Sequence, residues 1–406
     1  MAVDYKTPGV YVEEKSVMSL SVAGVSTAIA AFIGYTEKAD PGYGKPIRIT
    51  TLKEYETLFG KAPMSDEEPD AEIQVTENSD GTYEVVMPAL KRVMHYSMQL
   101  FFNNGGASCY VVAVDGTTVT HEAAIESLRL EDEPTLIIMP DAVFESNYYT
   151  LCQNVLSLCG DMKDRFAIFD VQMTDGNTVA QDRDSFRTGI GTANIKYGAA
   201  YYPYVKTNIP YQYEDSNVTI TGAEPAKLDT ISNGTEKYNK IKKAIASKTI
   251  TLPVSCAVAG VYARVDRDRG VWKSPANVSL NSVLGPIIKL TEEENGDLNI
   301  DSTGGKSINA IRNFTGKGTL VWGARTLAGN DNEWRYISVR RLFNYIEESV
   351  QKATAFSVFE PNVAMTWLKI RSMIESFLDT LWRQGALAGG KAEDAYFVQC
   401  GLATTM

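Results

Sequence analysis

The stretch TLIIMPDAVFESNYYTLCQNVLSLCGDMKDRFAIFDV (residues 135–171) decides the fold class. Two apolar runs of strand length, Thr135 to Met139 and Phe166 to Val171, enclose a segment with helical spacing from Glu145 to Cys159. A strand, a helix and a second strand in this order predict a βαβ unit, in which the two strands lie parallel in one sheet.

The alternation of strands and helices continues on both sides of this unit. Downstream, we expect a helix near Asp182 to Arg187 and a strand from Tyr197 to Val205. Upstream, the continuous apolar runs Ser26 to Tyr35 and Cys109 to Val114 are typical of strands buried on both faces. The pattern therefore predicts a parallel sheet covered by helices.

Between the two upstream strands, helical spacing occurs at residues 52–59 and 89–102. A polar, acidic insertion at 63–81 separates these helices and leads into a hairpin strand predicted from Tyr83 to Val86. A second polar insertion, at 215–233, follows the last strand of the βαβ region.

The C-terminal third predicts two amphipathic helices. The first occupies 333–353, with Phe343 among its apolar positions. The second is expected to begin at an Asn362 cap and to end before Gly385, a residue suited to the position after a helix. The apolar positions of this second helix that should be buried are Trp367, Ile370, Ile374, Phe377, Leu378 and Leu381.

Taken together, these elements predict a mixed α+β and α/β fold with three regions. Residues 1–22 are expected to form an extended arm, because Pro8-Gly9 precedes one short β-prone run, Val10 to Val12. Residues 23–115 and 305–406 should together form a core domain. Residues 116–304 would then be an inserted outer domain of the βαβ type.

Composition excludes several classes of protein. The 406 residues carry a net charge of −11, so the chain lacks the excess of Lys and Arg that gripping nucleic acid requires. No apolar stretch is long enough to span a bilayer, and we expect no membrane insertion and synthesis in the cytoplasm. The five cysteines form no CxxC pair, which argues against a zinc site or a disulfide framework.

The chain shows few residues with the chemistry of an active site. The two histidines have no Ser or Cys motif beside them, so we expect no catalytic triad, no metal and no cofactor. GGKS (residues 304–307) resembles a fragment of a P-loop, but Ile300 stands where that motif requires glycine. Asp141 and Asp170 each follow a strand, where a carboxylate either caps a helix or turn or binds a ligand.

Several stretches in a characteristic order make the chain resemble the contractile tail sheath proteins. These proteins form the sheaths of myophage tails and of related contractile injection particles. The stretches are TPGVYVEE (7–14), VSTAIAAFIGYT (25–36), LKEYETLFG (52–60), LFFNNGGASCYVV (100–112), AGVYARVDRDRGVWKSPAN (259–277), INAIRNFTGKGTLVWGARTL (308–327), YISVRRLFNYIEESV (336–350), FEPN (359–362) and LWRQGALAGG (381–390).

The resemblance implies a structural subunit, not an enzyme, that forms stacked hexameric rings around an inner tube and contracts. It makes 23–115 plus 305–406 the sheath core domain. Implied partners are further copies of the chain, the inner tube protein, the baseplate, and terminator or cap proteins. The particle would assemble in the bacterial cytoplasm and act as a phage tail or a released extracellular machine.

Three groups of residues are expected to make contacts between subunits. Positive charge in the C-terminal region is consistent with two roles for the helix near Trp334: a contact with an acidic inner tube, or a solvated helix face, since helices commonly expose charged side chains. Its candidate contacts are Arg335, Arg340, Arg341 and Lys352. The arm residues expected to add a strand to a neighbouring sheet are Val10, Tyr11, Val12 and Glu13, and a C-terminal edge strand is expected at Tyr396, Phe397 and Val398.

Two other classes of function compete with this interpretation. An α/β enzyme could bind a phosphorylated ligand in the middle domain. A passive surface-array protein is the third class, and the lack of a secretory signal in the opening residues disfavours it. The sequence leaves open whether the particle is a phage tail, a bacteriocin or an injection machine aimed at eukaryotic cells. The opening residues are closer to the injection-machine branch.

Overall fold

The computed structural model describes residues 21–62, 72–222 and 226–404. The chain divides into two compact units, Val25–Glu347 and a smaller one that contains Glu348 onward. The arm residues Val10, Tyr11, Val12 and Glu13 lie outside the described residues.

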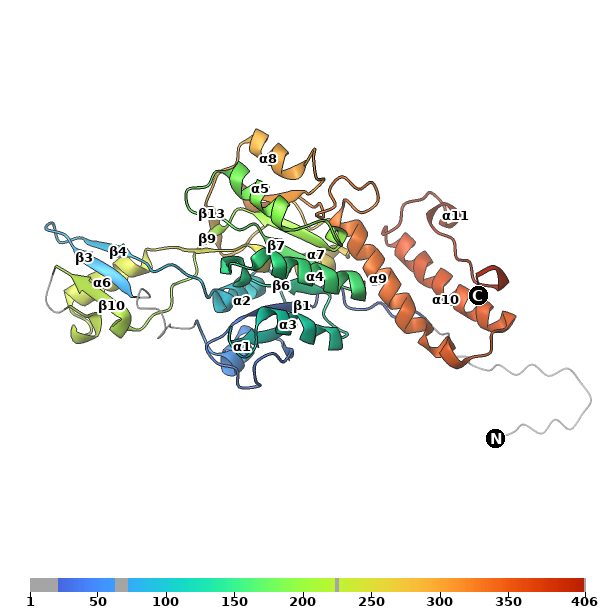
Figure 1. Ribbon diagram of the computed structural model, residues 1–406, viewed down its shortest axis with the longest axis horizontal. Helices are drawn as coiled ribbons and strands as arrows, with labels where there is room; N and C mark the ends of the chain where they lie inside the picture. Colours follow the sequence, from blue (N-terminus) through green and yellow to red (C-terminus); the bar gives the residue numbers. More distant parts are fainter. Residues whose placement is uncertain (1–20, 63–71, 223–225, 405–406) are drawn as a thin grey trace, which may run out of the picture. The chain divides into compact units, whose positions relative to one another are not determined.

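A large mixed sheet forms the centre of the larger unit (Figure 1). Among the described residues it has nine strands, in the order β12 (Val278–Ser279), β15 (Gly318–Trp322), β14 (Ile308–Phe314), β8 (Gly198–Tyr202), β7 (Phe166–Asp170), β6 (Leu136–Ile138), β1 (Ala30–Tyr35), β5 (Cys109–Val114) and β2 (Ile47–Ile49). The strands from β14 to β5 in this order are parallel, and β15, β12 and β2 add antiparallel edges. The predicted parallel βαβ sheet is therefore confirmed.

Helices cover both faces of this sheet, which makes its central strands apolar on both sides. One layer contains α1 (Leu52–Phe59), α2 (Met94–Asn103) and α7 (Ser255–Arg269), packed on alternate residues such as Phe32 and Ile138. The other contains α3 (His121–Ser127), α4 (Tyr148–Met162) and α5 (Val179–Gly189), packed on the intervening residues such as Ile33 and Ile137. Farther along the chain, α8 (Glu292–Asn299) adds Leu298 to this second core.

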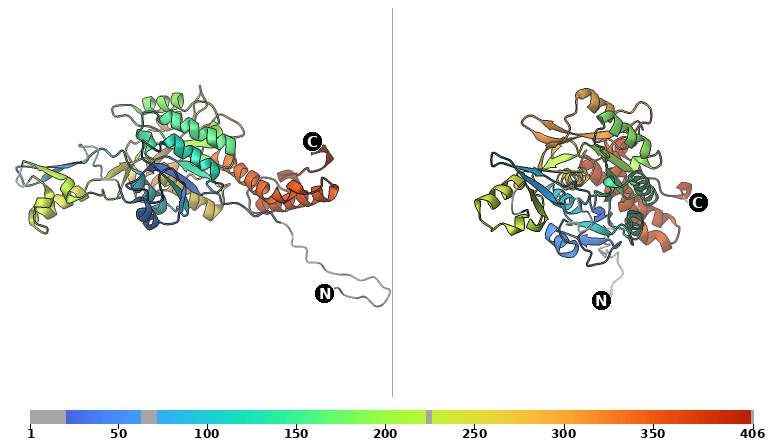
Figure 2. Two further views of the ribbon diagram at one scale, coloured as in Figure 1. Left: turned by 60° about the horizontal axis from the view of Figure 1, so that its bottom comes forward. Right: turned by 60° about the vertical axis from the view of Figure 1, so that its left-hand side comes forward.

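The two polar insertions meet in space. Strand β3 (Ile73–Glu77) lies in the first insertion and β4 (Tyr83–Val86) follows it, whereas β10 (Val218–Thr221) lies in the second and α6 (Glu236–Ala246) follows that one. β10 pairs in parallel with β3, and α6 covers one face of this small sheet with Ile241 and Ile245. Figures 1 and 2 show the blue hairpin beside the yellow-green helix.

The expected strand from Tyr197 to Val205 is two strands in the structure. β8 ends at Tyr202 and belongs to the large sheet, whereas β9 (Val205–Thr207) pairs with β11 (Ile250–Leu252) and β13 (Val283–Pro286). Pro203 lies between them and has no backbone N–H to donate to a ladder, which accounts for the break.

The large sheet runs through both expected domain boundaries. Residues 30–114 supply β1, β2 and β5, residues 136–202 supply β6 to β8, and residues 308–322 supply β14 and β15. The compact units instead divide at 347/348, inside helix α9 (Ile337–Thr354). The segment 116–304 supplies the central strands β6, β7 and β8 and the edge strand β12 of the large sheet, while its other strands belong to the two smaller sheets.

The smaller unit contains the last turns of α9, followed by α10 (Ala364–Arg383) and α11 (Ala392–Ala395). Within the described residues, none of the helices combines the length and the apolar character that crossing a bilayer requires.

Candidate functional site

Asp141 lies just beyond the carboxyl end of β6, and both of its carboxylate oxygens accept hydrogen bonds from the backbone. Its carboxylate accepts hydrogen bonds from the backbone N–H groups of Tyr35, at 2.8 Å, and Val93, at 2.5 Å. Val93 precedes α2, so the carboxylate lies at the positive N-terminal end of that helix. Burial raises the pKa of Asp141 to about 7, against the opposite effect of the backbone donors.

Asp170 has the same role on the neighbouring strand, at the end of β7. Its Oδ1 accepts hydrogen bonds from the backbone N–H groups of Val254, at 2.7 Å, and Ser255, at 2.9 Å, which open helix α7. Burial raises its pKa to about 6. The two interpretations of these aspartates were a helix or turn cap and a ligand-binding carboxylate, and the structure supports the cap. Each aspartate, however, caps a helix that is distant in the sequence and not the one that follows it.

The histidines and cysteines are packed into the core. His95 is buried, contacts Glu56 through Nε2 at 3.2 Å, and stacks among Tyr55 and Tyr96. Burial lowers the pKa of both His95 and His121, which keeps both rings neutral.

The five thiols are free, and burial raises the pKa of the four that are fully buried: Cys109, Cys152, Cys159 and Cys256. A raised pKa suppresses the reactive thiolate.

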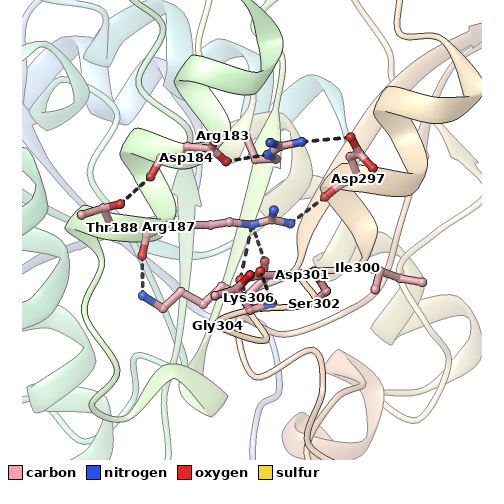
Figure 3. A pocket seen from close by; sticks show the side chains of 11 residues that line it. Arg183, Asp184, Arg187, Thr188, Asp297, Ile300, Asp301, Ser302, Gly304 and Lys306 are labelled. Atoms are coloured by element: carbon pink, nitrogen blue, oxygen red, sulfur yellow. Dashed lines mark hydrogen bonds and ion pairs between the residues drawn. The ribbon is translucent and has the colours of Figure 1, made fainter.

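The GGKS loop closes on an internal carboxylate. Asp301 accepts hydrogen bonds from the backbone N–H groups of Thr303 and Lys306, both at 3.0 Å. In a P-loop, such backbone groups would face a phosphate. These loop donors are therefore occupied, and the loop lines a polar pocket instead (Figure 3).

Two of the four residues expected to contact an inner tube are buried. The Arg340 side chain is 2% exposed; its guanidinium lies 4.0 Å from the ring centre of Trp334 and bonds to Asn344 at 2.8 Å. The Arg341 side chain is 3% exposed and pairs with Asp266 at 2.5 Å. Both arginines belong to the interior of the larger unit, so the expectation that they form a contact surface is wrong. Charge periodicity on a helix does not reveal such buried partners.

Arg335 remains accessible and lies within a surface that sequence reasoning did not find. We call this surface the cationic ledge; its members are Lys196, Trp334, Arg335, Tyr336 and Phe343. Lys196 Nζ lies 5.1 Å from the ring centre of Trp334, which packs edge-on against Phe343 at 5.1 Å. Phe343, expected on the buried face of its helix, is exposed, as is Tyr336. In the sequence, the run EWRY at 333–336 was the one indication of this surface. Lys196 could not be assigned to it, because it lies in a short 3₁₀ helix far away along the chain.

Lys352, the fourth expected contact, lies in the smaller unit. It pairs with Glu348 one turn earlier in α9, at 2.7 Å. Its charge is therefore partly balanced by its own helix.

Helix α10 exposes much of its apolar surface. Met373, Phe377 and Leu381 are buried, whereas Met365 and Leu368 are exposed, and Phe359 just before the helix is 98% exposed. Asn362 does not cap the helix backbone: its side-chain oxygen accepts the indole N–H of Trp367. An exposed apolar surface of this kind is typical of a protein interface.

The expected C-terminal edge strand is not formed in the single chain. Tyr396, Phe397 and Val398 have no strand assignment, and Phe397 is 86% exposed. A strand exists only when its backbone groups pair with another edge, and the described residues of this unit offer none.

Comparison with known families gives two adjacent matches. Residues 116–327 match the phage tail sheath protein central domain, and residues 329–401 match the phage tail sheath C-terminal domain. The tail sheath protein of Enterobacteria phage T4 is 26% identical over 166 residues, which cover 41% of this chain and 24% of that protein. That of Burkholderia phage BcepMu is 32% identical over 148 residues, covering 34% of this chain and 30% of its own. The chain thus matches less than half the length of these relatives.

Solved sheath structures match nearly the whole chain. The sheath complex of the extracellular contractile injection system PVC, in its contracted state, is 31% identical, with a TM-score of 0.68, over 100% of this chain and 90% of the other. The contracted helical sheath of the anti-feeding prophage is 29% identical, with a TM-score of 0.65, over 99% of this chain and 91% of the other.

Proposed function

Since the chain belongs to the phage tail sheath protein family, we propose that it is the subunit of a contractile sheath. The single observation that carries this proposal is the likeness over the whole chain to the sheath of an extracellular contractile injection system. That likeness favours an injection particle over a phage tail, because the phage relatives match only a fraction of their length.

The sheath we propose consists of hexameric rings of this chain, stacked around an inner tube. Its other partners would be a baseplate and terminator or cap proteins, and the assembled particle would leave the bacterial cell. The anti-feeding prophage baseplate, another similar structure, supports the baseplate as a partner. Head-to-tail contacts between copies generate open helical assemblies of this kind.

Two sequence segments are proposed to link neighbouring subunits. The arm residues Val10 to Glu13 would add a strand to a neighbour's sheet edge, and Tyr396 to Val398 would pair in the same way. The exposure of Phe397 supports this role, because a neighbour would cover the ring.

We propose the cationic ledge as the surface that faces an acidic inner tube, in place of Arg340 and Arg341. Exposed Tyr336 and Phe343 supply the apolar contact that aromatic side chains give to interfaces. Lys196 and Arg335 supply the positive charge. Arg340 would act from beneath, holding Trp334 in place by stacking.

A charge reversal tests both the assembly and this assignment. The wild-type chain, produced together with its inner tube protein, should sediment as large particles. Lys196→Glu combined with Arg335→Glu should reduce the sedimenting fraction, most strongly at low salt. The matched control Lys317→Glu changes an exposed lysine in the turn between β14 and β15 and should assemble normally. Equal assembly of all three proteins removes the ledge from the interface, whereas no assembly of the wild type counts against the sheath itself.

An enzyme that binds a phosphorylated ligand is the weaker candidate. We expect no nucleotide hydrolysis, because Asp141 and Asp170 already bind backbone N–H groups and the GGKS loop already binds Asp301. Nucleotide turnover lost on replacing Lys306 would revive this candidate.

A further inference from the structure

A polar pocket of about 600 Å³ opens between α5, α8 and the loop 300–306 (Figure 3). A volume of this size is typical of small-molecule sites. Three cationic side chains line the pocket: Arg183 and Arg187 from α5, and Lys306 from the glycine-containing loop.

Arg187 and Lys306 are held at the floor of the pocket by backbone oxygens. Arg187 Nε donates to the carbonyl oxygen of Lys306 at 2.9 Å, and the Lys306 ammonium donates to the carbonyl oxygen of Arg187. Arg187 Nη2 donates to the carbonyl oxygens of Asp297 and Leu298. These contacts fix the two cations in place without neutralising them, since carbonyl oxygens carry no full charge.

Both cations retain donor capacity. A lysine ammonium has three N–H groups, and within the described residues the Arg187 carbonyl is the one acceptor at hydrogen-bond distance from Lys306. The Nη1 group of Arg187 has no acceptor among the described residues. Burial lowers the pKa of both side chains, as expected for positive charges that their surroundings do not fully compensate.

The three aspartates of the pocket offset part of this charge. The Asp301 carboxylate, held in place by backbone N–H groups of its own loop, lies 3.7 Å from Arg187 and balances part of the charge of the two floor cations. Asp184 and Asp297 lie at the rim, with side chains 63% and 59% exposed, where water screens them. Arg183 lines the pocket and pairs with both of these rim aspartates, at 2.8 Å and 3.1 Å.

We propose that this pocket binds an oxyanion, held by Arg187 and Lys306 at the floor and by Arg183 at the rim. Carboxylates and phosphates share the geometry that arginine recognises. Two sources of that chemistry exist: a free anion such as phosphate, and a carboxylate side chain of an adjoining copy of this acidic chain. Only the second source depends on the proposed sheath assembly.

Titration calorimetry with inorganic phosphate tests the site on the purified full chain. Wild-type protein should bind phosphate saturably, with one site per chain. Arg183→Gln should weaken binding about tenfold, the effect of losing one charge-assisted hydrogen bond. Ser302→Glu places a carboxylate in the pocket from an exposed loop position and should abolish binding without loss of fold.

Arg267→Gln is the matched control, since Arg267, like Arg183, pairs with the aspartate that follows it, at 3.2 Å, but lies on α7. It should bind phosphate as the wild type does. Wild-type protein that shows no saturable binding, or Ser302→Glu that binds phosphate unchanged, overturns the proposal. Sedimentation with and without phosphate then separates the sources. Inhibited assembly assigns the pocket to a neighbour's carboxylate, and unchanged assembly assigns it to a free anion.

Discussion

At the scale of single residues, the sequence located the important carboxylates but not their partners. Asp141 and Asp170 could be placed at the ends of strands, and a capping role was one of two interpretations. The N-cap residues Val93 and Val254, whose N–H groups they bind, lie 48 and 84 residues away in the sequence. Local pattern cannot identify such a partner, because the pairing depends on how the strands are ordered in the sheet.

The buried carboxylates predict a characteristic pH dependence. The folded pKa of Asp141, about 7, lies above the unfolded value of about 3.9. The folded state therefore holds its proton more tightly, and this contribution is present below pH 4 and is lost as the pH rises through 7. Asp170 acts in the same direction, while the lowered pKa values of His95 and His121 act in the opposite one.

Urea unfolding of wild type and Asp141→Asn between pH 5 and 8 isolates the effect of Asp141. The difference in free energy of unfolding between the two proteins should shift by about 1–3 kcal/mol in favour of the variant as the pH rises. A difference that stays constant across this range would show that Asp141 does not titrate there.

The ion pair between Arg341 and Asp266 predicts a large effect on stability. Both side chains are 3% exposed, and Arg341 also donates to the carbonyl oxygen of Thr27 at 2.7 Å. Arg341→Ala leaves a buried carboxylate without its partner and should lower the free energy of unfolding by about 3–5 kcal/mol. Arg335→Ala, at a half-buried position of the cationic ledge, should change it by less than about 0.5 kcal/mol in the same denaturation measurement. Similar small losses for both variants would contradict the buried position of Arg341.

At the scale of elements, hydrophobic pattern was the reliable signal. Helix α1 and strands β4 and β5 have the bounds that the pattern predicted, because each lies between clear turn or cap residues. The pairing of β3 with β10 could not be predicted, because both belong to insertions whose sequences are mostly polar. Each insertion alone contains too few apolar residues to indicate, in the sequence, that it forms part of a hydrophobic core.

The close packing of helices α2 and α7 gives a prediction for glycine. A Cβ atom on Gly260 would lie 2.5 Å from the carbonyl oxygen of Phe101 and 2.8 Å from Cβ of Asn104. Gly260→Ala should therefore lower the melting temperature, although alanine favours helices by about 1 kcal/mol over glycine. Gly296→Ala, in α8 where nothing lies within 4 Å, should raise it slightly by the same propensity. If both variants melt alike, the helices do not approach as closely as described.

At the scale of the whole molecule, the resemblance to sheath proteins identified the family. The sequence did not reveal which segments of the chain share the large sheet. The acidic turn Glu292 to Gly296 and the run Ser302 to Lys306 suggested a boundary near residue 305. The structure instead pairs β14 with β8 across it. Strand order across a parallel sheet depends on crossover connections, and periodicity along the chain carries no information about which strands become neighbours.

The N-terminal arm yields a prediction about assembly. Deleting Ala2 to Ser19 keeps every core residue that the structure describes, so we expect the variant to melt within a few degrees of the wild type. It should fail to form sedimenting particles, because the linking strand is lost. Tyr11→Pro, which removes one ladder donor, should show a weaker form of the same defect. A deletion variant that unfolds, or one that assembles normally, contradicts the role proposed for the arm.

The central claim is that this chain builds a contractile sheath. Electron microscopy of the purified chain, assembled with its inner tube protein, tests it most directly. The account predicts cylinders of stacked rings with sixfold symmetry that adopt a long, narrow form and a short, wide form. Monodisperse globular particles under all assembly conditions would contradict it.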